Sequence, residues 1–204
     1  MPKLIEQLKE RGVLHSPAII RALEEIDRAD FLPEELKYAA YEDTALPIAG
    51  GQTISQPYTV VFMLEQLHVR PGDIILEVGY GSGWQTALLA HLTGPSGRVY
   101  AFEIVPGLCS EGAQNLQKYP HLASRVRTLC MSGQSGYAEA APFDRIIVAA
   151  EVISVPKAWR AQLIINGRMI YPKENALILE VKKPDETFEV TKFPGFVFVP
   201  FIEH

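Results

Sequence analysis

Residues 76–83 read Leu-Glu-Val-Gly-Tyr-Gly-Ser-Gly and directly follow the strand-like residues Ile74 and Ile75. Glycines at alternate positions let a backbone turn pass close to a ligand, where a side chain would collide with it. A second carboxylate, Glu103, ends the next strand-like run, 20 residues after Gly83. This spacing is typical of a βαβ unit whose acidic residue binds ribose hydroxyls. The stretch therefore predicts an α/β fold that binds a nucleoside.

Glu77, two residues before the first glycine, indicates which nucleoside is bound. Its negative charge would repel the pyrophosphate of a dinucleotide, but it suits a ligand that carries an ammonium and a sulfonium. S-adenosylmethionine is such a ligand. The glycines are also spaced G-x-G-x-G, whereas dinucleotide-binding turns have G-x-G-x-x-G. We therefore predict S-adenosylmethionine as the cofactor, and a nicotinamide-dependent dehydrogenase is a distant alternative.

The composition is that of an ordinary globular protein and excludes several classes of partner. The chain has 204 residues, of which 48% are hydrophobic and 21% are charged, which suits one domain with a sizeable core. The net charge is −5 and the lysines and arginines are scattered, which argues against a nucleic-acid partner. No apolar stretch approaches the length of a membrane-spanning helix, so no membrane partner is expected.

The cysteines and the N-terminal residues bear on the compartment. Cys109 and Cys130 are the only two cysteines and form no C-x-x-C pair, which predicts free thiols rather than a disulfide framework. Residues 1–6 are amphipathic and charged and lack the apolar core of a signal peptide. We therefore expect a cytoplasmic protein. No metal is expected, because the histidines show no ligand spacing; they are His15, His68, His91, His121 and His204.

The order of the elements predicts a doubly wound, mostly parallel Rossmann-like sheet with helices on both faces. Residues 2–45 have helical periodicity, and from Ile74 onward strand and helix patterns alternate. Strands are expected at 74–78, 98–103, 127–131, 144–148, 168–171 and 176–181. Helices are expected at 84–91, 106–118 and 156–164, and the tail predicts an antiparallel pair at 188–192 and 196–201.

We expect a single methyltransferase domain over 1–204. Residues 1–70 would supply N-terminal helices and a substrate loop, and residues 71–204 would form the cofactor-binding core. The apolar tail at 193–201 could be a core edge, a contact surface or a strand partner for a bound peptide. The sequence does not determine the oligomeric state, and a monomer is favoured.

Several motifs together make the chain resemble the protein-L-isoaspartate O-methyltransferase family over nearly its whole length. The most specific is Gly-Gln-Thr-Ile-Ser-Gln-Pro-Tyr at 51–58, because few other families carry it. The glycine motif at 76–83 alone would indicate only a class I methyltransferase. The other matching segments are Ala45-Leu46-Pro47-Ile48, Glu103-Ile104-Val105, Ala141-Pro142-Phe143-Asp144 and Phe198-Val199-Pro200.

This resemblance implies an activity, a cofactor and a partner. Members of the family use S-adenosylmethionine to methylate the abnormal α-carboxylate of isoaspartyl residues in damaged proteins or peptides. The ester collapses to a succinimide, which can reopen to normal aspartate, so the implied function is protein repair. The implied partner is an isoaspartyl-containing protein or peptide.

Methylation of a carboxylate needs orientation rather than a base. An isoaspartyl α-carboxylate, with a pKa of roughly 3.5, is already ionised at neutral pH. In-line placement of the carboxylate oxygen, the methyl carbon and the sulfur contributes up to ~7–11 kcal/mol. Uncharged donors hold such a carboxylate without pairing it so tightly that it loses nucleophilicity. Ser55 matches the family's active-site serine and is assigned this role; Thr53 and Gln56 are further candidates.

The predicted cofactor-binding residues come from segments that follow strands. They are Glu77, Gly79, Tyr80, Gly81, Gly83, Glu103, Ile104, Ser132 and Gly133. Some candidates have plainer alternatives. Ser55 could simply cap the helix that begins near Tyr58, worth ~1 kcal/mol, and Trp84 is expected to pack rather than to stack on adenine. Glu77 and Glu103 could be surface acids that face a helix, but their places at the ends of buried strands favour a ligand role.

The chain departs from the family pattern at three places. The family has Gly-Asp-Gly after the third strand, with the Asp at the adenine amine, where this chain has Ser132 between Met and Gly. The loss of a charge-assisted bond of ~1.5–3 kcal/mol predicts roughly ten- to a hundred-fold weaker cofactor binding. Ala149 replaces the Thr of Val-Thr-Ala, and Glu151 adds a negative charge near the expected acceptor. Residues 171–175 replace Pro-Val-Gly and a glutamine-bearing loop.

Two further alternatives therefore stay open. Ser132, Ala149 and Glu151 would suit a related class I methyltransferase that acts on a different carboxylate or hydroxyl acceptor. A protein that kept the fold but lost the donor site would bind without catalysis. The intact glycine motif and Glu103 argue against this second alternative.

Overall fold

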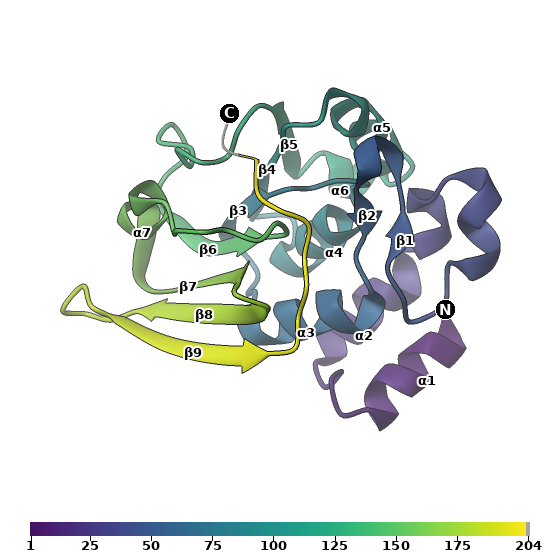
Figure 1. Ribbon diagram of the computed structural model, residues 1–204, viewed down its shortest axis with the longest axis horizontal. Helices are drawn as coiled ribbons and strands as arrows, with labels where there is room; N and C mark the ends of the chain where they lie inside the picture. Colours follow the sequence, from purple (N-terminus) through teal and green to yellow (C-terminus); the bar gives the residue numbers. More distant parts are fainter. Residues whose placement is uncertain (203–204) are drawn as a thin grey trace.

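The computed structural model describes residues 1–202 and shows a seven-stranded sheet with most of its helices on one side (Figure 1). The strand order is β5-β4-β3-β6-β7-β8-β9, in which β5 to β7 are parallel and β8 and β9 are antiparallel additions. This arrangement confirms the predicted Rossmann-like fold. The strands are β3 (Ile74–Val78), β4 (Arg98–Glu103), β5 (Val126–Cys130), β6 (Phe143–Val148), β7 (Leu163–Lys173), β8 (Ala176–Lys182) and β9 (Phe188–Pro194).

A switch in strand order determines where a ligand can bind. The chain runs from β3 outward through β4 to β5, then returns to β6 on the other side of β3. The carboxyl ends of β3, β4 and β6 therefore meet at the crevice where open α/β sheets bind their ligands. A small antiparallel pair, β1 (Leu46–Pro47) and β2 (Thr53–Ile54), is joined by the 3₁₀ turn η3 (Ala49–Gly51).

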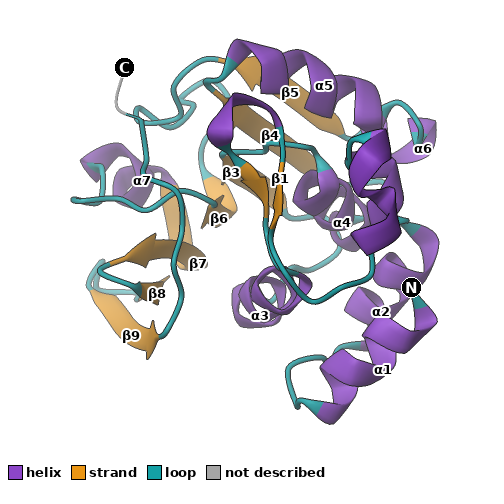
Figure 2. Ribbon diagram, turned by 45° about the vertical axis from the view of Figure 1, so that its right-hand side comes forward, coloured by secondary structure: helices purple, strands orange, loops and turns teal. Residues whose placement is uncertain are grey.

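The helices are distributed unequally (Figure 2). Side chains alternate along the strands: Ile75 and Ile147 face the core shared with α1 to α6, and Leu76 and Ile146 face a second core that contains Trp159 of α7. The helices are α1 (Pro2–Glu10), α2 (Pro17–Glu25), α3 (Pro57–Leu67), α4 (Trp84–Thr93), α5 (Pro106–Leu116), α6 (Pro120–Ala123) and α7 (Lys157–Gln162), with 3₁₀ helices η1 (Arg28–Phe31) and η2 (Glu34–Ala39).

The prediction of a strand at 196–201 was wrong. Gly195 adopts φ +95°, and the N–H groups of Gly195 and Phe196 both bond to Asn175 O, so the chain turns away from β9. The segment then runs along the carboxyl ends of the sheet and passes in front of β6 (Figure 1). It makes a single parallel bridge there, between Glu151 and Pro200. Within this segment Pro200 lacks the N–H that a regularly paired strand needs.

The prediction of free thiols was also wrong, because Cys109 and Cys130 form a disulfide with a Cα–Cα distance of 5.5 Å. Cys109 lies on α5 and Cys130 ends β5, so the bond joins a helix to the sheet edge that it covers. A separation of 21 residues along the chain does not reveal this contact. Cysteine usage therefore no longer supports a reducing compartment, and cytoplasmic localisation stays a prediction.

Two further predictions concern membrane-spanning helices and the histidines. Within residues 1–202, no helix combines the length and apolarity required for a membrane span. His204 lies outside the described residues.

Candidate functional site

A cavity lies at the carboxyl ends of the parallel strands, under the β1–β2 pair. Its walls come from the turn after β3, the residues after β4, β5 and β6, the strand β2 and the C-terminal segment. The lining residues are Gln52, Thr53, Ile54, Ser55, Val60, Val78, Gly79, Tyr80, Gly81, Ser82, Trp84, Gln85, Phe102, Glu103, Ile104, Val105, Leu108, Met131, Gly133, Ala149, Ala150, Val199, Pro200, Phe201 and Ile202. The segments that the sequence predicted to meet thus surround one cavity.

Gly79 and Gly81 of the glycine turn line this cavity, whereas Gly83, also predicted as a cofactor-binding residue, does not line it and packs against Gly112 and Leu116 of α5. Gly79, Gly81 and Gly83 have φ of +85°, +52° and +90°, a region that other residues rarely adopt. The N–H groups of Gly79 and Tyr80 both bond to Phe102 O, at 2.7 and 3.0 Å. The turn is therefore tied to β4 and stays open toward the ligand.

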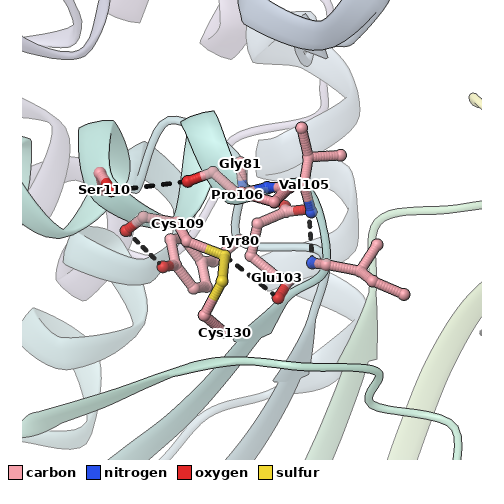
Figure 3. Close-up of a disulfide and its surroundings, with 9 residues drawn as sticks. Tyr80, Gly81, Glu103, Val105, Pro106, Cys109, Ser110 and Cys130 are labelled. Atoms are coloured by element: carbon pink, nitrogen blue, oxygen red, sulfur yellow. Dashed lines mark hydrogen bonds between the residues drawn. A yellow bond between two sulfur atoms is a disulfide. The ribbon is translucent and has the colours of Figure 1, made fainter.

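Glu103 joins the turns after β3 and β4 (Figure 3). Its Oε2 accepts the N–H of Gly81 at 2.9 Å, and its Oε1 accepts the N–H groups of Ile104 and Val105 at 2.8 and 2.9 Å. A carboxylate has about four acceptor positions, so roughly one remains for a ligand hydroxyl. Glu103 is 7% exposed and lines the cavity, as a ribose-binding acid would.

Tyr80 contributes to the wall as a packed side chain. It is buried, and its hydroxyl donates to Cys109 O at 2.7 Å, which ties the glycine turn to the disulfide-linked helix α5 (Figure 3). Gly112 on α5 lets the two segments approach closely. A Cβ there would overlap Gly81 O and lie 2.8 Å from Tyr80 Cε2.

Glu77 does not line the cavity. Its side chain is fully buried beneath the turn, where Gln85 Nε2 donates to Oε1 at 3.0 Å. Among residues 1–202, Oε2 has no hydrogen-bond partner. Burial raises the pKa of Glu77 to about 7. Gln85 does line the cavity, so the structure puts a neutral amide where the sequence predicted a carboxylate.

Ser55 lies where the cavity opens into a neighbouring groove, and it lines both. The cap alternative does not hold, because α3 is capped by Gln56 without a side-chain hydrogen bond. Within residues 1–202 Ser55 accepts a hydrogen bond from Arg28 through its backbone carbonyl, and its hydroxyl makes none, so the hydroxyl is free to donate to an acceptor. Thr53 also lines both spaces. Gln56 lines only the groove, where its Nε2 donates to Asp43 O at 3.0 Å.

The groove next to the cavity runs between α3 and the C-terminal segment. Aromatic rings form one wall: Phe62 lies 5.0 Å from Phe193 and 4.9 Å from Phe196, between ring centroids. Tyr58 continues this wall, with the Arg11 guanidinium 4.2 Å from its ring centroid. The groove shares Thr53, Ser55, Ala149 and Val199 with the cavity.

The departures from the family pattern have different outcomes. Ser132 is not among the cavity-lining residues, and its hydroxyl accepts the N–H of Gln134 at 3.4 Å. Glu151 is also absent from the cavity. Its Oε1 accepts the N–H of Asn175 at 3.3 Å, on the far side of the C-terminal segment. Ala149 does line the cavity, so only the lost hydroxyl, and not the added charge, changes the acceptor side.

Several lining residues were not among the predicted site residues. Met131 and Phe102 line the cavity beside the predicted Gly133 and Ile104, and the chain from Val199 to Ile202 closes its far side. The hydrophobic pattern of the sequence identifies such residues only as members of the core. A rule that takes each residue following a parallel strand would have found Met131, but no local signal marks the C-terminal segment.

The residues of the cavity fit an S-adenosyl group. Glu103 has an acceptor position for a ribose hydroxyl, and the glycine turn leaves room for the chain that carries the sulfonium. Ile104 and Met131 offer apolar surface to a flat ring. The indole Nε1 of Trp84 is a buried donor without a partner among residues 1–202, on a residue that lines the cavity.

Comparisons with known proteins agree with this assignment. The family model of protein-L-isoaspartate(D-aspartate) O-methyltransferase (PCMT) matches residues 1–204. A protein-L-isoaspartate O-methyltransferase of Ignicoccus hospitalis is 39% identical, over 98% of this chain and 96% of its own. One of Anaeromyxobacter dehalogenans is 46% identical over 97% and 95%. The crystal structure of the PCMT of Plasmodium falciparum, in complex with S-adenosyl-L-homocysteine, has a TM-score of 0.89 at 24% identity, covering 99% of this chain and 98% of that one.

The contact between Gly112 and the glycine turn leads to a first prediction. Gly112→Ala forces the turn away from α5, at a strain of about 1–3 kcal/mol, and should weaken binding of S-adenosylhomocysteine by about tenfold or more in isothermal calorimetry. Gly107→Ala is the matched control, because it lies on the same helix and a Cβ there meets nothing within 4 Å. Equal affinities of the two variants would contradict the role of this contact.

The burial of Glu77 leads to a second prediction. Because the pKa of the folded protein is raised to about 7, folding favours the protonated carboxyl. The contribution of Glu77 to the free energy of unfolding should therefore fall as pH rises from about 4.5 to about 7, by about 3 kcal/mol. Denaturant unfolding of the cofactor-free protein from pH 5 to 8 measures it. Glu77→Gln should lose less stability over this range than the wild type; parallel pH profiles would contradict the burial effect.

Proposed function

The chain belongs to the protein-L-isoaspartate(D-aspartate) O-methyltransferase family, and from this premise we propose how its residues act. The protein is an S-adenosylmethionine-dependent carboxyl methyltransferase that methylates isoaspartyl residues, which is a protein-repair activity. When bound, the cofactor supplies an activated methyl group on a sulfonium. The chain itself binds the cofactor and the isoaspartyl carboxylate, orients them and excludes water.

On the donor side, we propose that Glu103 binds the ribose through the open acceptor position of Oε2. Its three bonds to backbone N–H groups hold the carboxylate rigidly, so little entropy is lost when a hydroxyl binds. Ile104 and Met131 flank the adenine. Glu77 acts through Gln85, whose carbonyl oxygen is directed away from Glu77 by the bond that its Nε2 makes. That oxygen is the acceptor for the ammonium of the cofactor.

On the acceptor side, we propose that Ser55 orients the isoaspartyl carboxylate. The observation that carries this proposal is a hydroxyl without a protein partner at the junction of the cavity and the groove. Thr53 lies at the same junction and is a second donor. No base is required, because the α-carboxylate is ionised at neutral pH. A neutral donor fixes the direction of the attacking oxygen without neutralising its charge. This alignment is the source of the rate enhancement.

The groove suits the polypeptide that carries this carboxylate. An isoaspartyl residue extends the main chain through its side-chain carbonyl, so its α-carboxylate projects as a branch. We propose that the main chain lies along the aromatic wall of Tyr58, Phe62 and Phe196, and that the branch enters at Ser55. The alternative of a different acceptor loses support, because Glu151 adds no charge to the cavity wall.

Both parts of the chain are needed in this arrangement. We propose that residues 1–70 provide the acceptor loop and residues 71–204 the donor site of one domain. Support comes from a continuous core in which Leu23 of α2 and Val61 of α3 pack with Leu88 of α4 and Ile147 of β6. In a single unit of this kind, donor and acceptor keep a fixed separation.

Two peptides test the substrate. They have identical sequences, except that one contains an isoaspartyl residue where the other contains aspartate. We expect radioactive methyl transfer from S-adenosylmethionine to the first peptide and background incorporation into the second. The product should release methanol at neutral pH as the ester collapses. Equal incorporation into both peptides would remove the repair activity while leaving the methyltransferase chemistry.

Ser55→Ala tests the orienting hydroxyl in the same assay. Turnover of the isoaspartyl peptide should fall by about 10- to 100-fold, because alignment of the carboxylate is lost. The melting temperature should stay nearly constant, since the hydroxyl supports no protein hydrogen bond. Ser132→Ala is the control, at a serine that lines neither space. Unchanged turnover in Ser55→Ala would overturn the assignment.

A further inference from the structure

Arg28, the first residue of η1, is a buried cation for which the reaction described above has no use. Its side chain is completely buried, and among residues 1–202 no carboxylate forms an ion pair with it. Burial lowers the pKa of Arg28 to about 10, although the charge of Asp43 raises it from nearby, so the guanidinium remains charged at neutral pH. A buried charge is costly unless other groups replace its water.

Backbone carbonyls take the place of water around the two terminal nitrogens of Arg28, whereas its Nε has no hydrogen-bond partner among residues 1–202. Nη1 donates to Ala40 O at 2.9 Å and to Glu42 O at 3.3 Å. Nη2 donates to Thr44 O at 3.0 Å and to Ser55 O at 3.1 Å. One rigid, planar group thus binds the loop that leads into β1 and the residue that follows β2.

The same guanidinium also contacts the donor side. Its Cζ lies 5.2 Å from the centroid of the Trp84 ring, within the range of a cation–π interaction. Trp84 is 1% exposed, directly follows Gly83 and lines the cofactor cavity. Arg28 therefore touches both Ser55 of the acceptor loop and the first residue of the helix that carries the glycine turn.

From this geometry we propose that Arg28 is a positioning residue that sets the acceptor serine, Ser55, relative to the donor cavity at Trp84. The proposal rests on the function assigned above to Ser55. The guanidinium fixes the peptide group of Ser55 through its carbonyl, and thereby fixes the direction in which the hydroxyl points. Lysine cannot substitute, because its ammonium is a point donor that cannot satisfy four carbonyls in one plane while facing a ring.

A matched pair of variants separates this role from general stability. Arg145 is likewise buried and likewise donates to carbonyls, those of His68 and Asp144, although it also forms an ion pair with Asp73 at 3.3 Å. It lies near the amino ends of β3 and β6, away from the cavity. Arg28→Lys and Arg145→Lys should both lower the melting temperature. Per folded molecule, only Arg28→Lys should lower kcat for the isoaspartyl peptide, by about 10- to 100-fold.

A double-mutant cycle with Ser55→Ala tests whether Arg28 acts through Ser55. If it does, Arg28→Lys should change kcat by less than about twofold in the Ser55→Ala background. Full additivity of the two effects would overturn the proposal, as would an unchanged kcat in the single variant. The wild-type protein must first methylate the isoaspartyl peptide, so a failure of the proposed function is detected independently of a failure of the proposal about Arg28.

A measurement on the wild type applies even if Arg28→Lys does not fold. Saturation with the isoaspartyl peptide, in the presence of S-adenosylhomocysteine, should shift the guanidinium resonances of Arg28 and the indole N–H of Trp84 in ¹⁵N spectra. The resonances of Arg145 and of the Trp159 indole should not move. A peptide that binds without shifting Arg28 or Trp84 would overturn the coupling.

Discussion

The convergence of three backbone N–H groups on the carboxylate of Glu103 is the interaction on which the site depends. Gly81 belongs to the turn after β3, and Ile104 and Val105 follow β4. Buried N–H groups without a partner would each cost about 1–3 kcal/mol, so this one side chain makes two sharp turns compatible with a dry cavity. The acid that would bind ribose is thus also the group that builds the ribose site.

Helix α5 supports this arrangement from behind. Gly112 allows the helix to reach the glycine turn, and the Tyr80 hydroxyl binds the carbonyl of Cys109. The disulfide from Cys109 to Cys130 then joins the helix to β5, one residue before Met131 of the cavity wall. The donor cavity is therefore held by contacts among the glycine turn, α5 and β5, and Arg28 holds the acceptor loop while it also contacts Trp84 on the donor side.

Much of the fold could be predicted because its signals are local. The strands at 74–78 and 98–103 agree with prediction to the residue, since both are short, mostly apolar segments between clear turn residues. The boundary at Leu163 was misjudged: apolar residues continue from α7 into β7, and only pairing with Phe143 decides where the strand begins. The tail after Gly195 has the composition of a strand, but its hydrogen bonds go to Asn175 and Glu151.

By itself, the sequence determined the α/β class, the glycine turn, the acid Glu103 and the serine-containing segment at 51–58. Each of these features depends on residues that lie close together along the chain. Only the tertiary structure decided which side chains reach the cavity. It buried Glu77 behind Gln85, turned Glu151 toward Asn175, joined Cys109 to Cys130 and enclosed Arg28 in carbonyls. The physical reason is that burial and hydrogen-bond partners depend on segments that pack together from distant positions, and no local pattern contains that information.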